Sequence, residues 1–109
     1  MFTVKKRLEI SASHRLNLGY ESKCKNLHGH NWILNLYLKS ENLNENGMVE
    51  DFTKIKKLIV DTLDHKNLND IISQPTAENI ALFIATKLGE KCYKVEVQES
   101  EGNTVVYER

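Results

Sequence analysis

Apolar and polar residues alternate from the start of the chain. The apolar residues share one parity and the polar residues share the other, with Lys6 the one exception: Phe2, Val4, Leu8, Ile10 and Ala12 against Thr3, Lys5, Arg7, Glu9, Ser11 and Ser13. This period of two predicts a strand over residues 2–14, with one face in a core and the other in solvent. A polar loop over residues 15–27 follows. A second alternation, with Trp32, Leu34, Leu36 and Leu38 on its apolar face, predicts a strand that begins at about His28.

Two later segments have the apolar spacing of helices. The apolar positions are Phe52, Ile55, Leu58, Ile59 and Leu63 in the first segment, and Ala77, Ile80, Ala81, Ile84, Ala85 and Leu88 in the second. Asp51 stands where the first helix needs an N-cap, and this helix is expected to end near residues 64–65. Thr76 is the expected N-cap of the second helix, and Gly89 is a natural C-terminal stop.

The end of the chain returns to alternation. Tyr93, Val95 and Val97 predict a third strand that ends at Glu99, a turn follows at residues 100–103, and residues 104–107 predict a fourth strand. The order strand, strand, helix, helix, strand, strand predicts an α+β fold, in which two helices cover one face of a four-stranded antiparallel sheet. With 109 residues and no linker or repeat, residues 1–109 are expected to form a single domain.

Composition removes several classes of function. Lysine plus arginine and aspartate plus glutamate number 15 each, so no basic excess attracts nucleic acid or an anionic membrane. No apolar run reaches the roughly 20 residues of a membrane span, and no signal peptide is apparent. The two cysteines, Cys24 and Cys92, are therefore expected to be free thiols in a reducing cytoplasm. The chain also lacks the glycine-rich loops of nucleotide-cofactor sites and the Gly-x-Ser-x-Gly elbow of serine hydrolases.

Three histidines form a candidate metal site. His28 and His30 point to the same face of the second strand, roughly 6.5–7 Å apart along it. If the first two strands pair antiparallel, His14 at the end of the first strand lies beside both of them. Three imidazoles that leave a fourth position open are typical of catalytic zinc sites. The alternative is that these histidines are ordinary strand residues whose ring nitrogens bind backbone carbonyls.

Four further residues are candidates for chemistry. Cys24 lies between two lysines in the polar loop, where it could act as a base or nucleophile beside an open metal site, or close that site as a fourth ligand. Asp64 and His65 are adjacent, and adjacent side chains on a helix do not face each other, so a relay between them requires the helix end to unwind or groups from elsewhere. Glu99 keeps the parity of the core valines, and a carboxylate there could accept two N–H donors from a planar ligand.

Taken together, six segments resemble the 6-pyruvoyltetrahydropterin synthase / 6-carboxytetrahydropterin synthase family. They are residues 13–16, 24–30, 47–52, 63–69, 75–79 and 97–99, with a late Tyr107, and they cover nearly the whole chain. The resemblance implies zinc on His14, His28 and His30, Cys24 as general base with Asp64 and His65 completing a relay, and Glu99 as anchor of the pterin's amino-pyrimidine edge near Thr76 and Glu78. It also implies the tunnelling fold, in which the sheets of three subunits close into a barrel, two trimers stack as a homohexamer, and the active sites form between subunits.

The spacing Cys-x3-His-Gly-His and the short chain are most similar to the bacterial 6-carboxy branch of the family. That branch converts 7,8-dihydroneopterin triphosphate to 6-carboxy-5,6,7,8-tetrahydropterin, acetaldehyde and triphosphate, in the biosynthesis of queuosine and other 7-deazapurines. The alternatives are a 6-pyruvoyltetrahydropterin synthase and a zinc-stabilised pterin-binding module without catalysis, in which Cys24 closes the metal site. An aldolase or cyclohydrolase on the same barrel fold ranks lower, because such enzymes are expected to lack the three-histidine arrangement. Arg15, Lys23 and Lys25 are candidate contacts for the triphosphate.

Overall fold

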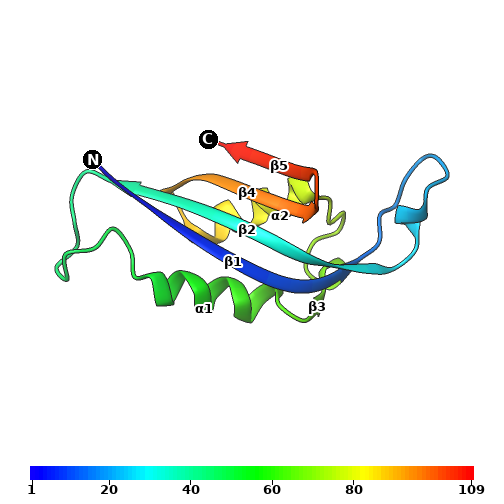
Figure 1. The fold of residues 1–109 in the computed structure, drawn as a ribbon, viewed down its shortest axis with the longest axis horizontal. Coiled ribbons are helices and arrows are strands. Elements are labelled where there is room, and N and C mark those ends of the chain that lie inside the picture. Colours follow the sequence, from blue (N-terminus) through cyan, green and yellow to red (C-terminus); the bar gives the residue numbers. More distant parts are fainter.

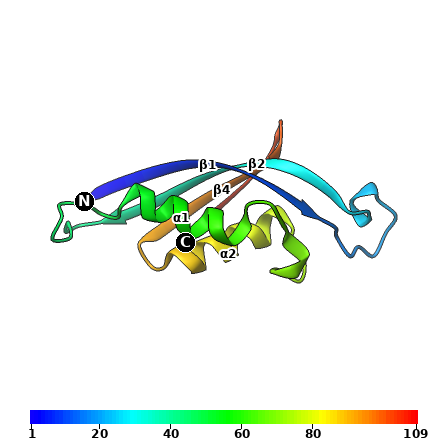
Figure 2. The same ribbon diagram turned by 90° about the horizontal axis from the view of Figure 1, so that it is seen from below.

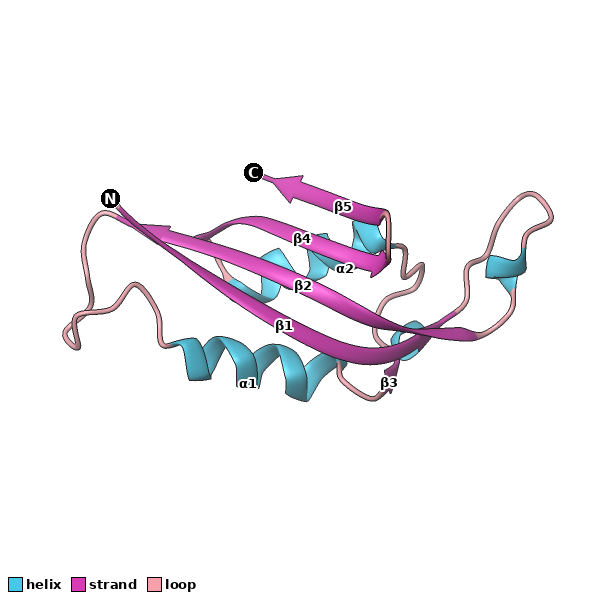
Figure 3. Ribbon diagram, viewed as in Figure 1, coloured by secondary structure: helices cyan, strands magenta, loops and turns pink.

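The computed structural model describes all of residues 1–109 and consists of one sheet with two helices on the same face (Figures 1 and 2). In chain order the elements are β1 (Phe2–His14), the 3-10 turn η1 (Lys23–Lys25), β2 (His28–Ser40), α1 (Phe52–Leu63), β3 (Lys66–Asn67), the 3-10 turn η2 (Leu68–Asp70), α2 (Ala77–Leu88), β4 (Cys92–Ser100) and β5 (Asn103–Glu108). The strands lie in the order β3-β1-β2-β4-β5 across the sheet. The predicted α+β class and the predicted order of the main elements are confirmed (Figure 3).

The pairing of β1 with β2 is the longest in the sheet. It is antiparallel and runs without interruption from Phe2 opposite Ser40 to His14 opposite His28. The molecule is elongated along this ribbon, with extents of 51 × 24 × 24 Å. The loop over residues 15–27 lies beyond both helices at one end of the long axis (Figure 1). The predicted antiparallel pairing is therefore confirmed, and it brings the end of β1 to the start of β2.

The core lies between the sheet and the two helices. It contains 19 buried apolar residues: 17 come from β1, β2, β4 and one stripe of each helix, and the other two are Val49 and Leu68. The opposite face of the sheet carries the polar parity and has no layer packed on it (Figure 2). The one buried polar side chain of the molecule is that of His14, which is 0% exposed. A buried imidazole has to be explained by what its two nitrogens bind.

Both helices start and end as the sequence predicts. The side chain of Asp51 accepts a hydrogen bond from the backbone of Thr53 at the start of α1, and Thr76 accepts one from Asn79 at the start of α2. Gly89 ends α2 with φ of 90°, a conformation that glycine adopts without steric cost. The cap at Thr76 also fixes the position of Pro75, the residue just before it. Neither helix is long and apolar enough to cross a membrane.

The sheet has one strand more than the expected four. The chain leaves α1 after Leu63, His65 takes a left-handed backbone conformation with φ of 56°, and the next two residues pair parallel to β1 as β3. The sheet is therefore mixed and not wholly antiparallel. A strand of two residues is too short to show a period of two, so the sequence pattern could not predict it.

Candidate metal centre and active site

The three candidate metal ligands meet at the end of the β1–β2 ribbon. His14 lies directly opposite His28, and His30 is on the same face of β2. The ring centroid of His14 is 4.5 Å from that of His28 and 5.2 Å from that of His30. The centroids of His28 and His30 are 4.9 Å apart. One nitrogen from each ring lies within 4.8 Å of the other two. The convergence expected from strand parity is present.

Two backbone carbonyls determine which nitrogens are free. The Nδ1 of His14 is 2.8 Å from the carbonyl oxygen of Pro75, and the Nδ1 of His28 is 2.6 Å from that of Asn26. A carbonyl oxygen only accepts, so each Nδ1 carries the hydrogen and each neutral ring has a bare lone pair on Nε2. The alternative interpretation is thus right for Nδ1 of His14 and of His28, whereas the buried Nε2 atoms of His14 and His30 have no hydrogen-bond partner.

The carboxylate of Glu99 faces the same point. Its Oε1 lies 3.5 Å from Nε2 of His14 and 3.7 Å from Nε2 of His30. Burial is the main cause that lowers the pKa of both histidines from 6.5, and neighbouring imidazoles act in the same direction. Glu99 opposes the shift, as does the hydrogen bond from His14 to Pro75. Both imidazoles are therefore neutral near pH 7. Lone pairs that face a carboxylate repel it unless a cation lies between them, so this donor set fits a divalent metal such as zinc.

Trp32 forms the floor of the cluster. Its side chain is 0% exposed, its ring centroid is 4.9 Å from that of His14 and 5.1 Å from that of His30, and its Nε1 donates to the carbonyl of Ala12 over 3.1 Å. Edge-to-face packing of this kind restricts the ring planes of both histidines. The sequence pattern placed Trp32 only in the core. Its position two residues after His30 is the signal that could have assigned it to the site.

The three residues that the sequence pointed to for substrate binding line one cavity. Glu99, Thr76 and Glu78 border a space of 390 Å³, together with Leu16 and the turn between β4 and β5. This volume lies in the range of small-molecule sites, roughly 300–1,000 Å³. Because Glu99 also faces the histidines, the cavity and the candidate metal centre share one wall.

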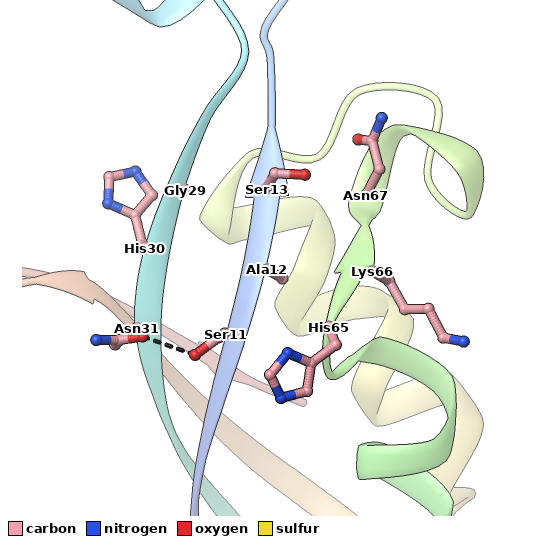
Figure 4. A pocket seen from close by; sticks show the side chains of 9 residues that line it. All are labelled: Ser11, Ala12, Ser13, Gly29, His30, Asn31, His65, Lys66 and Asn67. Atoms are coloured by element: carbon pink, nitrogen blue, oxygen red, sulfur yellow. Dashed lines mark hydrogen bonds between the residues drawn. The ribbon is translucent and has the colours of Figure 1, made fainter.

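Asp64 and His65 lie on the other side of β1. Asp64 Oδ2 is 3.6 Å from Nε2 of His65, and both residues bind β1: Ser11 donates its N–H to Asp64 Oδ1 over 2.9 Å and accepts from the backbone of His65 over 2.7 Å. They face each other because the helix has ended and His65 has a positive φ. In Figure 4, His65 and His30 line the same polar cavity of 460 Å³, with β1 lying between the two residues.

Cys24 occupies a third position, on η1 in the loop at the tip of the ribbon (Figure 1). Its N–H donates to Ser22 Oγ over 3.1 Å, and its carbonyl accepts from Leu16 over 2.8 Å. No hydrogen bond joins Cys24 to Asp64 or His65, and the histidine cluster does not include its sulfur. Within one chain the candidate residues therefore form three groups: the metal ligands with Glu99, the Asp64–His65 pair, and Cys24. The geometry gives no support for Cys24 as a fourth metal ligand in the same chain.

Known proteins are similar to this chain in sequence and in fold. The family model for 6-pyruvoyl tetrahydropterin synthase matches residues 3–109. A 6-carboxy-5,6,7,8-tetrahydropterin synthase from Synechocystis is 37% identical, over 92% of this chain and 88% of its own length. A dihydroneopterin monophosphate aldolase from Pyrococcus furiosus is 38% identical, over 75% of this chain and 70% of its own. The structure of 6-pyruvoyl tetrahydropterin synthase from Caenorhabditis elegans superposes with a TM-score of 0.78 and 32% identity, covering 99% of this chain and 95% of that one.

Proposed function

The chain belongs to the 6-pyruvoyl tetrahydropterin synthase family, whose enzymes are lyases that act on pterin triphosphates, and we propose that it converts 7,8-dihydroneopterin triphosphate to 6-carboxy-5,6,7,8-tetrahydropterin. The product would serve the biosynthesis of queuosine and other 7-deazapurines. One observation carries the proposal: bare imidazole nitrogens converge beside Glu99, which lines a cavity together with Thr76 and Glu78. The Cys-x3-His spacing favours the carboxy product.

The proposed metal is zinc, held by Nε2 of His14, His28 and His30. When bound there, zinc would polarise the side-chain oxygens of the substrate and make the adjacent C–H protons more acidic. The hydrogen bonds from Nδ1 of His14 and His28 to backbone carbonyls fix the tautomer that can bind a metal. The burial that lowers the pKa of His14 and His30 keeps their ring nitrogens free of competing protons at neutral pH.

Glu99 is the proposed anchor of the pterin. A carboxylate matches the two parallel N–H groups of an amino-pyrimidine edge, as it matches a guanidinium. Thr76 and Glu78 border the same cavity and would contact the ring. The Glu99 carboxylate is also less than 4 Å from two of the histidines, so a pterin anchored there would lie beside the candidate metal centre.

Cys24 is the proposed general base, with Asp64 and His65 as its relay. A positioned base of this kind contributes roughly 10²–10⁴-fold to a proton transfer. Because Cys24 stands apart from the other two within one chain, we propose that they meet across a subunit boundary in a homohexamer. The exposed edge strand β5 favours such an assembly, since an unpaired strand edge is a site for pairing with another chain.

The proposed reaction balances without a redox cofactor. The ring C6–N5 bond gains two hydrogens, the first side-chain carbon becomes a carboxyl group with an oxygen from water, the other two carbons leave as acetaldehyde, and triphosphate departs. Oxidation of the side chain thus supplies the reduction of the ring. This agrees with the absence of a dinucleotide-binding motif from the sequence.

Product identification tests the proposal. Zinc-loaded protein is incubated with 7,8-dihydroneopterin triphosphate, and the products are identified by mass spectrometry. Acetaldehyde with a 6-carboxy product is the expected result. A three-carbon side chain retained on the tetrahydropterin, without acetaldehyde, would identify the pyruvoyl reaction instead.

A second candidate is an aldolase, which is favoured by the 38% identity to the enzyme from Pyrococcus furiosus. An aldolase would cleave dihydroneopterin monophosphate between the first two side-chain carbons and release a phosphorylated two-carbon aldehyde. The monophosphate is therefore run in parallel with the triphosphate. Zinc binding without turnover of either compound would indicate a pterin-binding module.

A further inference from the structure

One connecting segment follows the free edge of β1 beyond the end of the sheet. On this edge the odd-numbered residues of β1 offer their backbone groups, and segment 64–74 binds them in succession. Ser11 pairs with the Asp64 carboxylate and the His65 backbone, and Ser13 lies in register with Asn67 of β3. The last pair between β1 and β2 is His14 with His28, so from residue 15 onward the chain no longer has β2 as a partner.

Two side-chain amides continue this pairing where the strand ends. Arg15 donates its N–H to Asn69 Oδ1 over 2.8 Å, and Asn69 Nδ2 donates to the carbonyl of Arg15 over 2.9 Å. Asn17 donates its N–H to Gln74 Oε1 over 3.0 Å, and Gln74 Nε2 donates to the carbonyl of Asn17 over 2.9 Å. Each amide thus makes the pair of bonds that a neighbouring strand residue would make. We call Asn69 and Gln74 the amide clamp.

The residue between the two clamped positions binds Cys24. In an extended chain, successive backbone N–H groups point to opposite sides, so Leu16 faces away from the clamp. Its N–H donates to the carbonyl of Cys24 over 2.8 Å. The loop over residues 15–27 thus has a fixed base, and Cys24 is one hydrogen bond away from it.

The clamp residues are themselves held. The carbonyl of Gln74 accepts from the backbone of Thr76 over 2.9 Å and from Nδ2 of Asn79 over 2.8 Å. The N–H of Asn69 donates to Oδ1 of Asn67, the N-cap of η2, over 3.1 Å. Both amides therefore project from fixed backbone, which is what a positioning group requires.

We infer that Asn69 and Gln74 are positioning residues for Cys24: the amide clamp sets the direction in which the loop presents the thiol beyond its own chain. This rests on the proposed role of Cys24 as general base. The same segment, residues 64–74, also carries Asp64 and His65. It would therefore position the relay residues of its own chain and, through the amide clamp, orient Cys24 of that chain toward the next subunit.

The test compares Gln74→Met and Asn69→Leu with Asn44→Leu. Asn44 braces another loop, at the opposite end of the long axis, where its Oδ1 accepts from the backbone of Asn46 and Met48 (Figure 1). In the clamp variants we expect kcat to fall roughly ten- to hundredfold, as for displacement of a reacting group by about 1 Å, with KM and zinc content near wild-type values. Asn44→Leu should lose stability without this loss of kcat. An equal loss of kcat in all three variants would overturn the inference.

Gln74→Glu gives a second, pH-dependent readout. Its carboxylate still accepts from the N–H of Asn17 but no longer donates to the carbonyl, and protonation restores a donor. The ratio of variant to wild-type kcat should therefore rise as pH falls from about 8 to about 5, the range in which a glutamate begins to protonate. A flat ratio, measured well below the melting temperature, would overturn the role in positioning.

Limited trypsin digestion tests the clamp independently of any activity, because Lys23 and Lys25 lie in the loop that it holds. Cleavage after these lysines should be about tenfold faster or more in the clamp variants, since loss of the clamp favours local opening. An unchanged cleavage rate would refute the clamp itself. Faster cleavage in a protein that turns over no pterin would refute the proposed function and leave the clamp standing.

Discussion

Replacement of His30 by leucine separates the structural role of the histidine cluster from its metal-binding role. The buried Nε2 of His30 has no hydrogen-bond partner, and such an atom costs about 1–3 kcal/mol of stability. Leucine would remove that cost and keep an apolar contact with Trp32. The His30 side chain is 22% exposed, so leucine would place some apolar surface in water and offset part of this gain. We therefore expect the metal-free variant to be more stable than the metal-free wild type by about 1 kcal/mol.

For a domain of this size, that gain raises the melting temperature by roughly 4–8 °C. Zinc at about 100 times its dissociation constant should stabilise the wild type by about 2.7 kcal/mol, or roughly 10–20 °C, and His30→Leu should lose most of this increment. The assay is thermal unfolding by circular dichroism with EDTA and with zinc, at one protein concentration. His65→Asn is the control, because His65 lies outside the cluster and asparagine tolerates its positive φ.

Two results would refute this reasoning. A metal-free His30→Leu protein that melts below the metal-free wild type would mean that the imidazole is a satisfied structural group. A variant that keeps the full zinc increment would mean that His30 is not a ligand. Loss of the increment in the His65→Asn control would place the metal elsewhere.

Three further predictions concern the thiols and the effect of pH. Cys24→Ala should lower kcat about 10²–10⁴-fold with zinc content and melting temperature unchanged, whereas loss of zinc would support a closed structural site. Burial raises the pKa of the Cys92 thiol, which is 0% exposed, so a thiol reagent at pH 8 should label one cysteine in the native protein and two in urea; two in the native protein would contradict this. Because burial lowers the pKa of His14 and His30 from 6.5, the unfolded chain takes up protons that the folded metal-free protein does not as pH falls through 6.5. Its free energy of unfolding, from urea titrations at pH 7.5 to 5.5, should therefore decrease, and a flat profile would contradict the assignment.

Local patterns were sufficient for the main elements and, together with the assumption that the first two strands pair antiparallel, for the histidine convergence. Alternation predicted both strands of the ribbon, and parity put His28 and His30 on the core face of one strand and His14 on the core face of the other. The caps at Asp51 and Thr76 were equally readable, because a side-chain oxygen three or fewer residues from an unpaired N–H needs no tertiary partner. These features depend on backbone geometry over a few residues, and the sequence specifies that directly.

The contacts that complete the site depend on segments far apart in the chain. Pro75 selects the tautomer of His14 across 61 positions, and Asn69 and Gln74 pair with the strand extension across 54 and 57 positions. Nothing in the composition of a polar connection indicates which carbonyl or amide docks against β1.

The sequence by itself therefore determined which residues share a face, where the helices begin, and that three histidines can meet. Only the tertiary structure decided that the Nε2 atoms of His14 and His30 are buried without a partner, that Glu99 faces them, and that Asp64 and His65 leave the helix to bind β1. The physical reason is that periodicity is a property of one backbone segment, whereas hydrogen-bond satisfaction is a property of the packed chain, in which each buried donor or acceptor takes the partner that folding places beside it.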